Sequence, residues 1–201
     1  VNLDAARALT EGIRDLVHGG TTGFAGTLPM PPMRDGVLVA CTDGVGTKLK
    51  LAFELNKHDT VGIDLVAMSV NDILTTGGDP LLFLDYIGIA ALDEEKITRL
   101  IAGMADYLEA CDCILAGGET AEMPGLYPKG EYDLVGTIVG QVEKKKVITG
   151  ASIRKGDVLI GLPSTGLHTN GYSLARKVIF QKAKKKLSDL VPETKTTFEK
   201  A

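Results

Sequence analysis

The sequence predicts a mixed α/β (α+β) fold. Three apolar segments rich in β-branched residues, 37–42, 81–92 and 132–142, have the composition of strands. Two longer segments, 60–76 and 93–111, carry apolar residues at helical spacing. Because strand-like and helix-like segments alternate along much of the chain, we expect helices to pack against a sheet.

The composition indicates a globular protein with ample material for a core. Of the 201 residues 44% are hydrophobic, and 22 basic against 26 acidic residues give a net charge of -4. No basic field is therefore available to hold a nucleic acid by its backbone. The composition turns polar at residues 149–156, where we place a boundary between a domain of residues 1–150 and a second of residues 151–201.

The same sequence carries no signal for a membrane segment, a disulfide framework or a zinc site. No apolar run approaches the roughly 20 residues of a membrane helix, and residues 1–14 lack the basic-then-apolar order of a signal peptide. The cysteines Cys41, Cys111 and Cys113 are odd in number and lack CxxC spacing, so neither disulfides nor a zinc site are indicated. We expect a soluble, cytoplasmic protein with no membrane partner.

Residues 1–17 should open the chain with a short amphipathic helix. The Gly- and Thr-rich segment 18–26 that follows is either a connector, which its composition favours, or a loop that covers phosphates. A helix at residues 48–56 precedes the longer one at 60–76.

The first candidate site follows the strand at 37–42, in the stretch Cys41-Thr42-Asp43-Gly44-Val45-Gly46-Thr47-Lys48. Its two glycines let the backbone come close to a ligand and present N–H groups to phosphate oxygens. Lys48 adds a cation, and Asp43 can bind Mg²⁺ through oxygen. These residues alone leave two interpretations open, a site for nucleotide phosphates and metal or a Gly-rich turn.

The helix at 60–76 adds two polar candidates. Its expected core stripe consists of Ile63, Val66, Ala67, Val70, Ile73 and Leu74. Asp64 and Asn71 are seven residues apart, which places them within roughly 20° of each other beside that stripe. They face either a ligand pocket or solvent on the helix flank.

A second polar stretch follows the short strand expected at 113–116. Two glycines lead directly to Glu119, so we interpret this stretch as another strand end. A hard cation with bound phosphate takes carboxylates from more than one strand end, which makes Glu119 a candidate metal ligand. Taken singly, the stretch is a turn, but taken with Asp43, Asp64 and Asn71 it becomes the second half of a site.

The last section should contain a strand at 157–162, a Gly/Ser/Thr-rich loop at 163–171 and a helix at 172–183. A loop between a strand and a helix commonly presents backbone amides to an anion. His168 in this loop is either a functional residue or an ordinary loop residue.

Four stretches together resemble the aminoimidazole ribonucleotide synthetase (phosphoribosylformylglycinamidine cyclo-ligase) family. They run in order over nearly the whole chain: Thr42-Asp43-Gly44-Val45-Gly46-Thr47-Lys48, Gly62-Ile63-Asp64-Leu65-Val66-Ala67-Met68-Ser69-Val70-Asn71-Asp72, Gly117-Gly118-Glu119-Thr120-Ala121-Glu122-Met123-Pro124-Gly125 and Gly166-Leu167-His168-Thr169-Asn170-Gly171-Tyr172-Ser173-Leu174. Four long motifs in sequence are far more specific than one Gly-rich loop.

The resemblance implies a ligase that forms a C–N bond by cyclisation in purine biosynthesis. Formylglycinamidine ribonucleotide and ATP would give aminoimidazole ribonucleotide, ADP and phosphate. The γ-phosphate of ATP would activate the formamide oxygen, and an amidine nitrogen would then attack that carbon. Such chemistry needs positioning and charge neutralisation more than a protein nucleophile.

The resemblance also implies roles for individual residues. The Mg²⁺ ligands would be Asp43, Asp64, Asn71 and Glu119. ATP would be bound by Asp43, Gly44, Gly46, Thr47, Lys48, Asp64 and Thr120. The catalytic groups would be His168 and Lys48. The substrate would be bordered by Glu122, Met123, Asn170 and Gly171.

The family fold implied is an N-terminal domain whose mixed sheet pairs with that of a second subunit in a homodimer, followed by an α+β C-terminal domain. Here the chain stops soon after the helix at 172–183, the segment 18–26 is short for the family, and Arg14 stands where a lysine is common. We therefore expect a fragment or a chain with further segments, with weak or absent turnover on its own.

Two alternatives remain. Selenophosphate synthetase, thiamine-monophosphate kinase and the hydrogenase maturation protein HypE also place acids at strand ends for ATP and metals. The second alternative is a non-catalytic module that binds nucleotides or mediates dimerisation.

Overall fold

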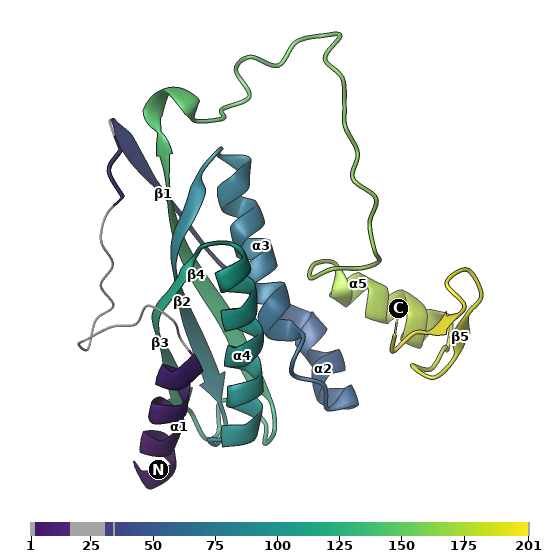
Figure 1. The fold of residues 1–201 in the computed structure, drawn as a ribbon. Coiled ribbons are helices and arrows are strands. Elements are labelled where there is room, and N and C mark those ends of the chain that lie inside the picture. Colours follow the sequence, from purple (N-terminus) through teal and green to yellow (C-terminus); the bar gives the residue numbers. More distant parts are fainter. Residues whose placement is uncertain (1–2, 17–30, 34, 201) are drawn as a thin grey trace.

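A four-stranded sheet organises the first three-quarters of the chain in the computed structural model, which describes residues 3–16, 31–33 and 35–200 (Figure 1). The strands are β1 (Gly36–Gly44), β2 (Asp79–Ile89), β3 (Ile114–Glu122) and β4 (Tyr132–Glu143), in the order β1-β4-β2-β3. β4 is antiparallel to both β1 and β2, whereas β2 and β3 are parallel. The predicted mixed sheet with helices is confirmed.

Two long helices cover one face of this sheet. α3 (Val61–Thr75) and α4 (Glu94–Ala110) lie side by side on it, and α1 (Leu3–Leu16) packs beside α4 (Figure 1). The core between these helices and the sheet contains the fully buried side chains of Leu65, Phe83, Ile87, Ile97, Met104, Leu134 and Ile138. Among the described elements, no helix covers the opposite face of the sheet.

Local signals explain where these helices begin. Asp93 caps α4 by accepting a hydrogen bond from the backbone N–H of Lys96 at 3.1 Å, and Glu94 and Glu95 follow in the first turn. α2 (Leu49–Leu55) follows a short 3₁₀ turn, η1 (Gly46–Lys48). None of the described helices is long and apolar enough to cross a bilayer.

The core stripe expected on α3 is partly wrong. Leu74 is 51% exposed, whereas Leu65, Met68 and Ser69, which the stripe omitted, are buried. α3 packs against both the sheet and α4, so its buried surface is wider than a single stripe and rotated from it.

Gly117 and Gly118 lie inside β3 and do not end it, because the parallel pairing with β2 continues to Glu122. A Cβ at position 118 would lie 2.1 Å from Oδ1 of Asp85 on the neighbouring strand. The glycine is therefore needed for the close approach of that side chain. Segment 18–26 lies outside the described residues.

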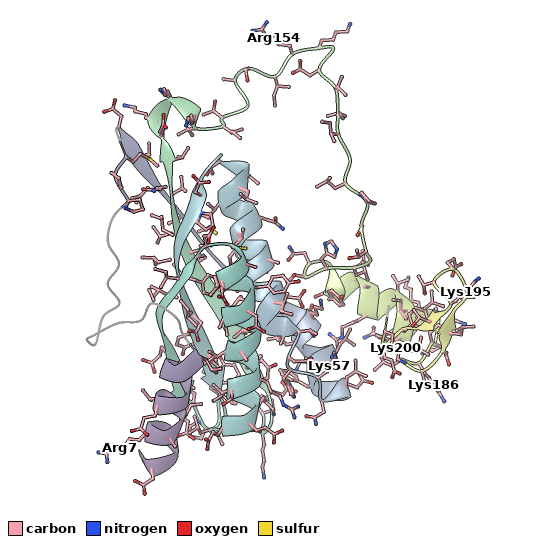
Figure 2. All side chains as sticks on the ribbon, in the orientation of Figure 1. Arg7, Lys57, Arg154, Lys186, Lys195 and Lys200 are labelled. Carbon is pink, nitrogen blue, oxygen red and sulfur yellow. The ribbon has the colours of Figure 1, made fainter. Side chains whose placement is uncertain are left out.

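The strand expected at 157–162 does not form. These residues run through an extended connector that carries its side chains into solvent, and Leu159 is 97% exposed (Figure 2). An apolar strand needs a neighbouring strand, and no described strand lies beside this one. The helix predicted at 172–183 is present, as α5 (Tyr172–Arg176) continued by the π-helical turn η3 (Lys177–Lys182). The short 3₁₀ turn η2 (Lys144–Lys146) follows β4, and the hairpin β5 (Leu190–Val191) and β6 (Thr196–Thr197) ends the described chain.

Candidate functional site

The loop before α5 docks on the first turn of α3 through Lys48. The Lys48 ammonium lies 2.8 Å from Oδ1 and 2.7 Å from Oδ2 of Asp64, and it donates to the backbone carbonyl of His168 at 2.6 Å. Gly46, with φ of 68°, turns the chain out of β1 and into η1, so that Lys48 faces α3. Two predicted site residues, Lys48 and Asp64, are thus joined directly to the loop that carries a third predicted residue, His168.

Asp64 is held from two sides. The hydroxyl of Thr169 lies 3.2 Å from Oδ1, in position to donate a hydrogen bond. Oδ2 is buried and has the Lys48 charge beside it but no well-directed hydrogen bond. This buried oxygen is therefore compensated by the Lys48 charge and not by a well-directed hydrogen bond.

His168 presents its ring to solvent while its backbone is fixed. The ring Nε2 lies 3.1 Å from the hydroxyl of Thr165. Asn170 is exposed, and Gly171, with φ of 81°, precedes the first turn of α5. His168 is thus held through its backbone carbonyl, while its imidazole remains exposed to solvent beside Thr165.

Three residues that the sequence did not single out, Tyr172, Ser173 and Thr169, complete the contact between this loop and the first domain. The Lys48 ammonium lies 5.2 Å from the centre of the Tyr172 ring, and the hydroxyls of Thr47 and Ser173 are 2.9 Å apart. Thr169 is the third. All belong to motifs that were recognised, but a run of polar loop residues does not reveal which of them turn inward.

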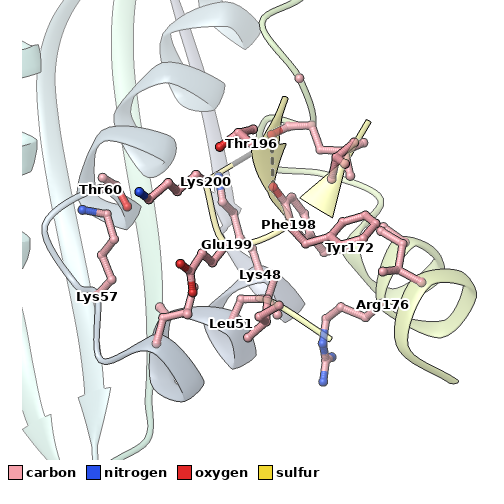
Figure 3. A pocket seen from close by; sticks show the side chains of 18 of the residues that line it. Lys48, Leu51, Lys57, Thr60, Tyr172, Arg176, Thr196, Phe198, Glu199 and Lys200 are labelled. Carbon is pink, nitrogen blue, oxygen red and sulfur yellow. Dashed lines mark hydrogen bonds between the residues drawn. The ribbon is translucent and has the colours of Figure 1, made fainter. Parts of the chain in front are cut away.

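A cavity of about 530 Å³ opens beside Lys48, between α2 and the segment from α5 to β6 (Figure 3). Its wall is largely apolar and includes Leu51, Ile179 and Phe198. Lys57, Arg176 and Lys200 also line it, and Glu199 is its single acidic residue. Its volume lies within the range of small-molecule sites, and the excess of cations favours an anionic ligand.

The remaining predicted metal ligands are not brought together. In sheet register Asp43 pairs with Gly136, which pairs with Asp85, which pairs with Gly118. Asp43 is thus on one edge strand and Glu119 on the other, three strand spacings or about 14 Å apart. Asn71 is seven residues beyond Asp64 on α3, about 10 Å along the helix.

Two other predicted residues, Glu122 at the end of β3 and Met123 directly after it, make structural contacts. Glu122 accepts a hydrogen bond from the backbone N–H of Leu92 at 2.7 Å, and the sulfur of Met123 accepts one from the Tyr86 hydroxyl at 3.8 Å. Thr120 lies on β3 between them and Glu119. These residues hold the end of β2 and the start of the following loop, away from Lys48.

The oxygen donors have the chemistry that Mg²⁺ prefers, but their arrangement does not form one site within this chain. Asp43 uses Oδ1 to accept from the N–H of Gly44 at 2.8 Å, and Asp64 is paired with Lys48. In the described part of the chain, no group of three His, Cys, Asp or Glu side chains is positioned to hold a metal.

Comparison with known families identifies two matching regions. Residues 25–142 match the profile of the AIR synthase related protein N-terminal domain, and residues 154–200 match that of the C-terminal domain. The chain is 56% identical over 188 residues to phosphoribosylformylglycinamidine cyclo-ligase of Burkholderia mallei and 55% identical to that of Burkholderia multivorans. Each alignment covers 89% of this chain and 54% of the relative, so the chain spans about half the length of these relatives.

Two solved structures share the fold at low identity. The hydrogenase maturation protein HypE in complex with ATP gives a TM-score of 0.59 at 19% identity, covering 76% of this chain and 44% of that one. Thiamine-monophosphate kinase from Stenotrophomonas maltophilia gives a TM-score of 0.50 at 23% identity, covering 72% of this chain and 42% of the kinase chain.

Proposed function

The chain belongs to the AIR synthase related protein family, and on that premise we propose that it is part of an ATP-dependent phosphoribosylformylglycinamidine cyclo-ligase. The enzyme would convert formylglycinamidine ribonucleotide to aminoimidazole ribonucleotide, ADP and phosphate in the cytoplasm. The 56% identity to relatives of that name supports this reaction over those of HypE and thiamine-monophosphate kinase, which share only the fold.

The single observation that carries the proposal is the double contact of Lys48. Its ammonium bridges Asp64 in the first domain and the carbonyl of His168 in the second. Three of the four recognised motifs therefore meet at one point.

At this point the chain's own groups can do what the reaction requires. Lys48 would neutralise phosphate charge as the formamide oxygen is phosphorylated, and Gly44, Gly46 and Thr47 would line the phosphates. The exposed imidazole of His168 would hold or move the proton that the amidine nitrogen loses on attacking the formamide carbon. Asn170 and Gly171 would border the substrate beside it.

Mg²⁺ would neutralise the phosphates further, held by Asp43, Asp64, Asn71 and Glu119. Because Asp43 and Glu119 lie on opposite edges of the sheet, a complete set would need groups from a second copy. Thr120, Glu122 and Met123, on the Glu119 edge, would then reach the nucleotide or substrate from that copy.

A homodimer is accordingly part of the proposal. The face of the sheet that the described helices leave open carries Leu38, Leu84, Tyr86, Val135 and Val139, and both leucines are exposed. An apolar sheet face of this kind fits against another sheet.

The reaction is tested with the full-length protein, ATP and formylglycinamidine ribonucleotide. We expect aminoimidazole ribonucleotide and ADP in equal amounts. ADP formed only with thiamine monophosphate or selenide would overturn the proposal, and Mg·ATP binding in calorimetry without turnover of any substrate would favour a binding module.

The shared site is tested by mixing two inactive full-length variants, Asp43→Asn and Glu119→Gln. If the two residues act from different copies, mixed dimers regain part of the activity. Activity that stays absent after verified subunit exchange would place both residues in one copy.

A further inference from the structure

Thr169 is the one buried residue in the whole segment 149–200, with 6% of its surface exposed. The residues around it in the loop, including His168 and Asn170, are exposed. A small polar side chain is thus the point at which this loop enters the first domain.

The contacts of Thr169 and Lys48 hold two adjacent residues of the loop, His168 and Thr169, at Asp64. The Thr169 hydroxyl lies 3.2 Å from Oδ1 of Asp64 and 3.5 Å from its backbone carbonyl. The carbonyl of the preceding residue, His168, accepts from Lys48 at 2.6 Å. Asp64 takes part in both arrangements, because it also pairs with Lys48.

We propose that Thr169 is a positioning residue, whose hydroxyl on Asp64 fixes the His168 imidazole relative to α3 and Lys48. This role rests on the proposed function, in which His168 acts on the substrate. The connector at 149–165 contains no buried residue, so it does not anchor the loop to the first domain from the N-terminal side. Thr165 bonds the ring but is itself part of the exposed connector, whereas Thr169 ties the loop to α3.

The proposal predicts a specific kinetic pattern in the full-length enzyme. Thr169→Val keeps the shape of the side chain but removes the hydroxyl, so kcat should fall about tenfold or more while KM for ATP changes less than about twofold. Thr169→Ser restores the hydroxyl and should recover most of kcat. Thr98→Val, at an exposed position on α4, is the matched control and should behave as wild type.

A second measurement is independent of turnover. The ring resonances of His168, assigned by their loss in His168→Gln, should shift or broaden in Thr169→Val and return in Thr169→Ser. Should Thr169→Val fail to fold, Thr169→Ala removes the hydroxyl without steric demand and takes its place.

The outcomes separate the two proposals. If wild type does not cyclise the substrate but the His168 resonances follow the hydroxyl, the proposed reaction is wrong and the positioning stands. If kcat and the His168 resonances of Thr169→Val match those of Thr98→Val, the positioning role is refuted. Equal losses in Thr169→Ser and Thr169→Val would also refute it, because shape and not the hydroxyl would then matter.

Discussion

Replacing Asp85 with asparagine should remove a pH-dependent loss of stability. Asp85 is buried in β2, and burial, assisted by the charge of Glu119 and opposed by a backbone hydrogen bond, raises the pKa of its carboxyl from 3.8 to about 7. The folded state therefore keeps this proton when the unfolded state has already lost it. The free energy of unfolding consequently falls as the pH rises from about 4 to about 7.

The size of the effect follows from the two pKa values. One unit of pKa difference corresponds to about 1.4 kcal/mol, so the span from 3.8 to about 7 amounts to about 4 kcal/mol. Some of this loss has already occurred at pH 5, and about 3 kcal/mol remains between pH 5 and pH 8. The Asp85→Asn protein should therefore gain about 3 kcal/mol over wild type across that interval.

Urea unfolding at pH 5 and pH 8 measures this gain. The chain contains no tryptophan, so circular dichroism is the suitable signal. Asp106→Asn, at an exposed position on α4, is the control. Its free energy of unfolding should differ from that of wild type by the same amount at both pH values, within about 0.5 kcal/mol. A difference between Asp85→Asn and wild type that is the same at both pH values would refute the reasoning.

Three further predictions rest on local packing and burial. Gly62→Ala should lower the free energy of unfolding by about 1–3 kcal/mol, because its Cβ would lie 2.3 Å from the carbonyl oxygen of Leu100. Gly12→Ala in α1, with open space around it, should raise that free energy by up to about 1 kcal/mol, and equal melting temperatures for the two variants would contradict this. Burial raises the pKa of Cys41 to about 11 and that of Cys113 to about 12, so iodoacetamide at pH 8 should label both slowly until urea is added, and rapid labelling of native Cys113 would count against its burial. Burial also lowers the pKa of His58, which bonds Tyr132, so stability should decline as the pH falls below about 6.5; thermal unfolding of His58→Gln should show a flatter decline, and an unchanged slope would exclude His58 as the cause.

Much of the first domain could be predicted because its elements carry local signals. The helix at 93–111 has a capping Asp93 and regular spacing, and it appears as α4 within a residue at each end. Leu74 could not be placed, because which side of α3 is buried depends on α4 as well as on the sheet.

The candidate site was predictable by residue type but not by partner. Sequence motifs identified Lys48, Asp64 and His168, and the structure brings the first two into contact with the loop of the third. Glu119 looked like a strand-end ligand beside Asp43, yet strand order, which spacing along the chain does not reveal, sets them on opposite edges. The metal set therefore stays a prediction.

The apolar segment at 157–162 shows that composition alone does not predict a strand. Its composition favours a strand, and the physics behind that preference is the burial of side chains against a neighbouring strand. Without such a neighbour in the described chain, Leu159 and the residues around it remain in solvent.

The order of strands also has a consequence for synthesis on the ribosome. β4 is the last sheet strand to be made, but it lies between β1 and β2, and Gly36 pairs with Glu143. A nascent chain that ends before residue 132 thus leaves β1 without its only described partner strand and one edge of β2 unpaired, and it cannot complete its sheet. Closure over such a long loop is slow, so we expect the emerging chain to depend on protection from aggregation until β4 has left the exit tunnel.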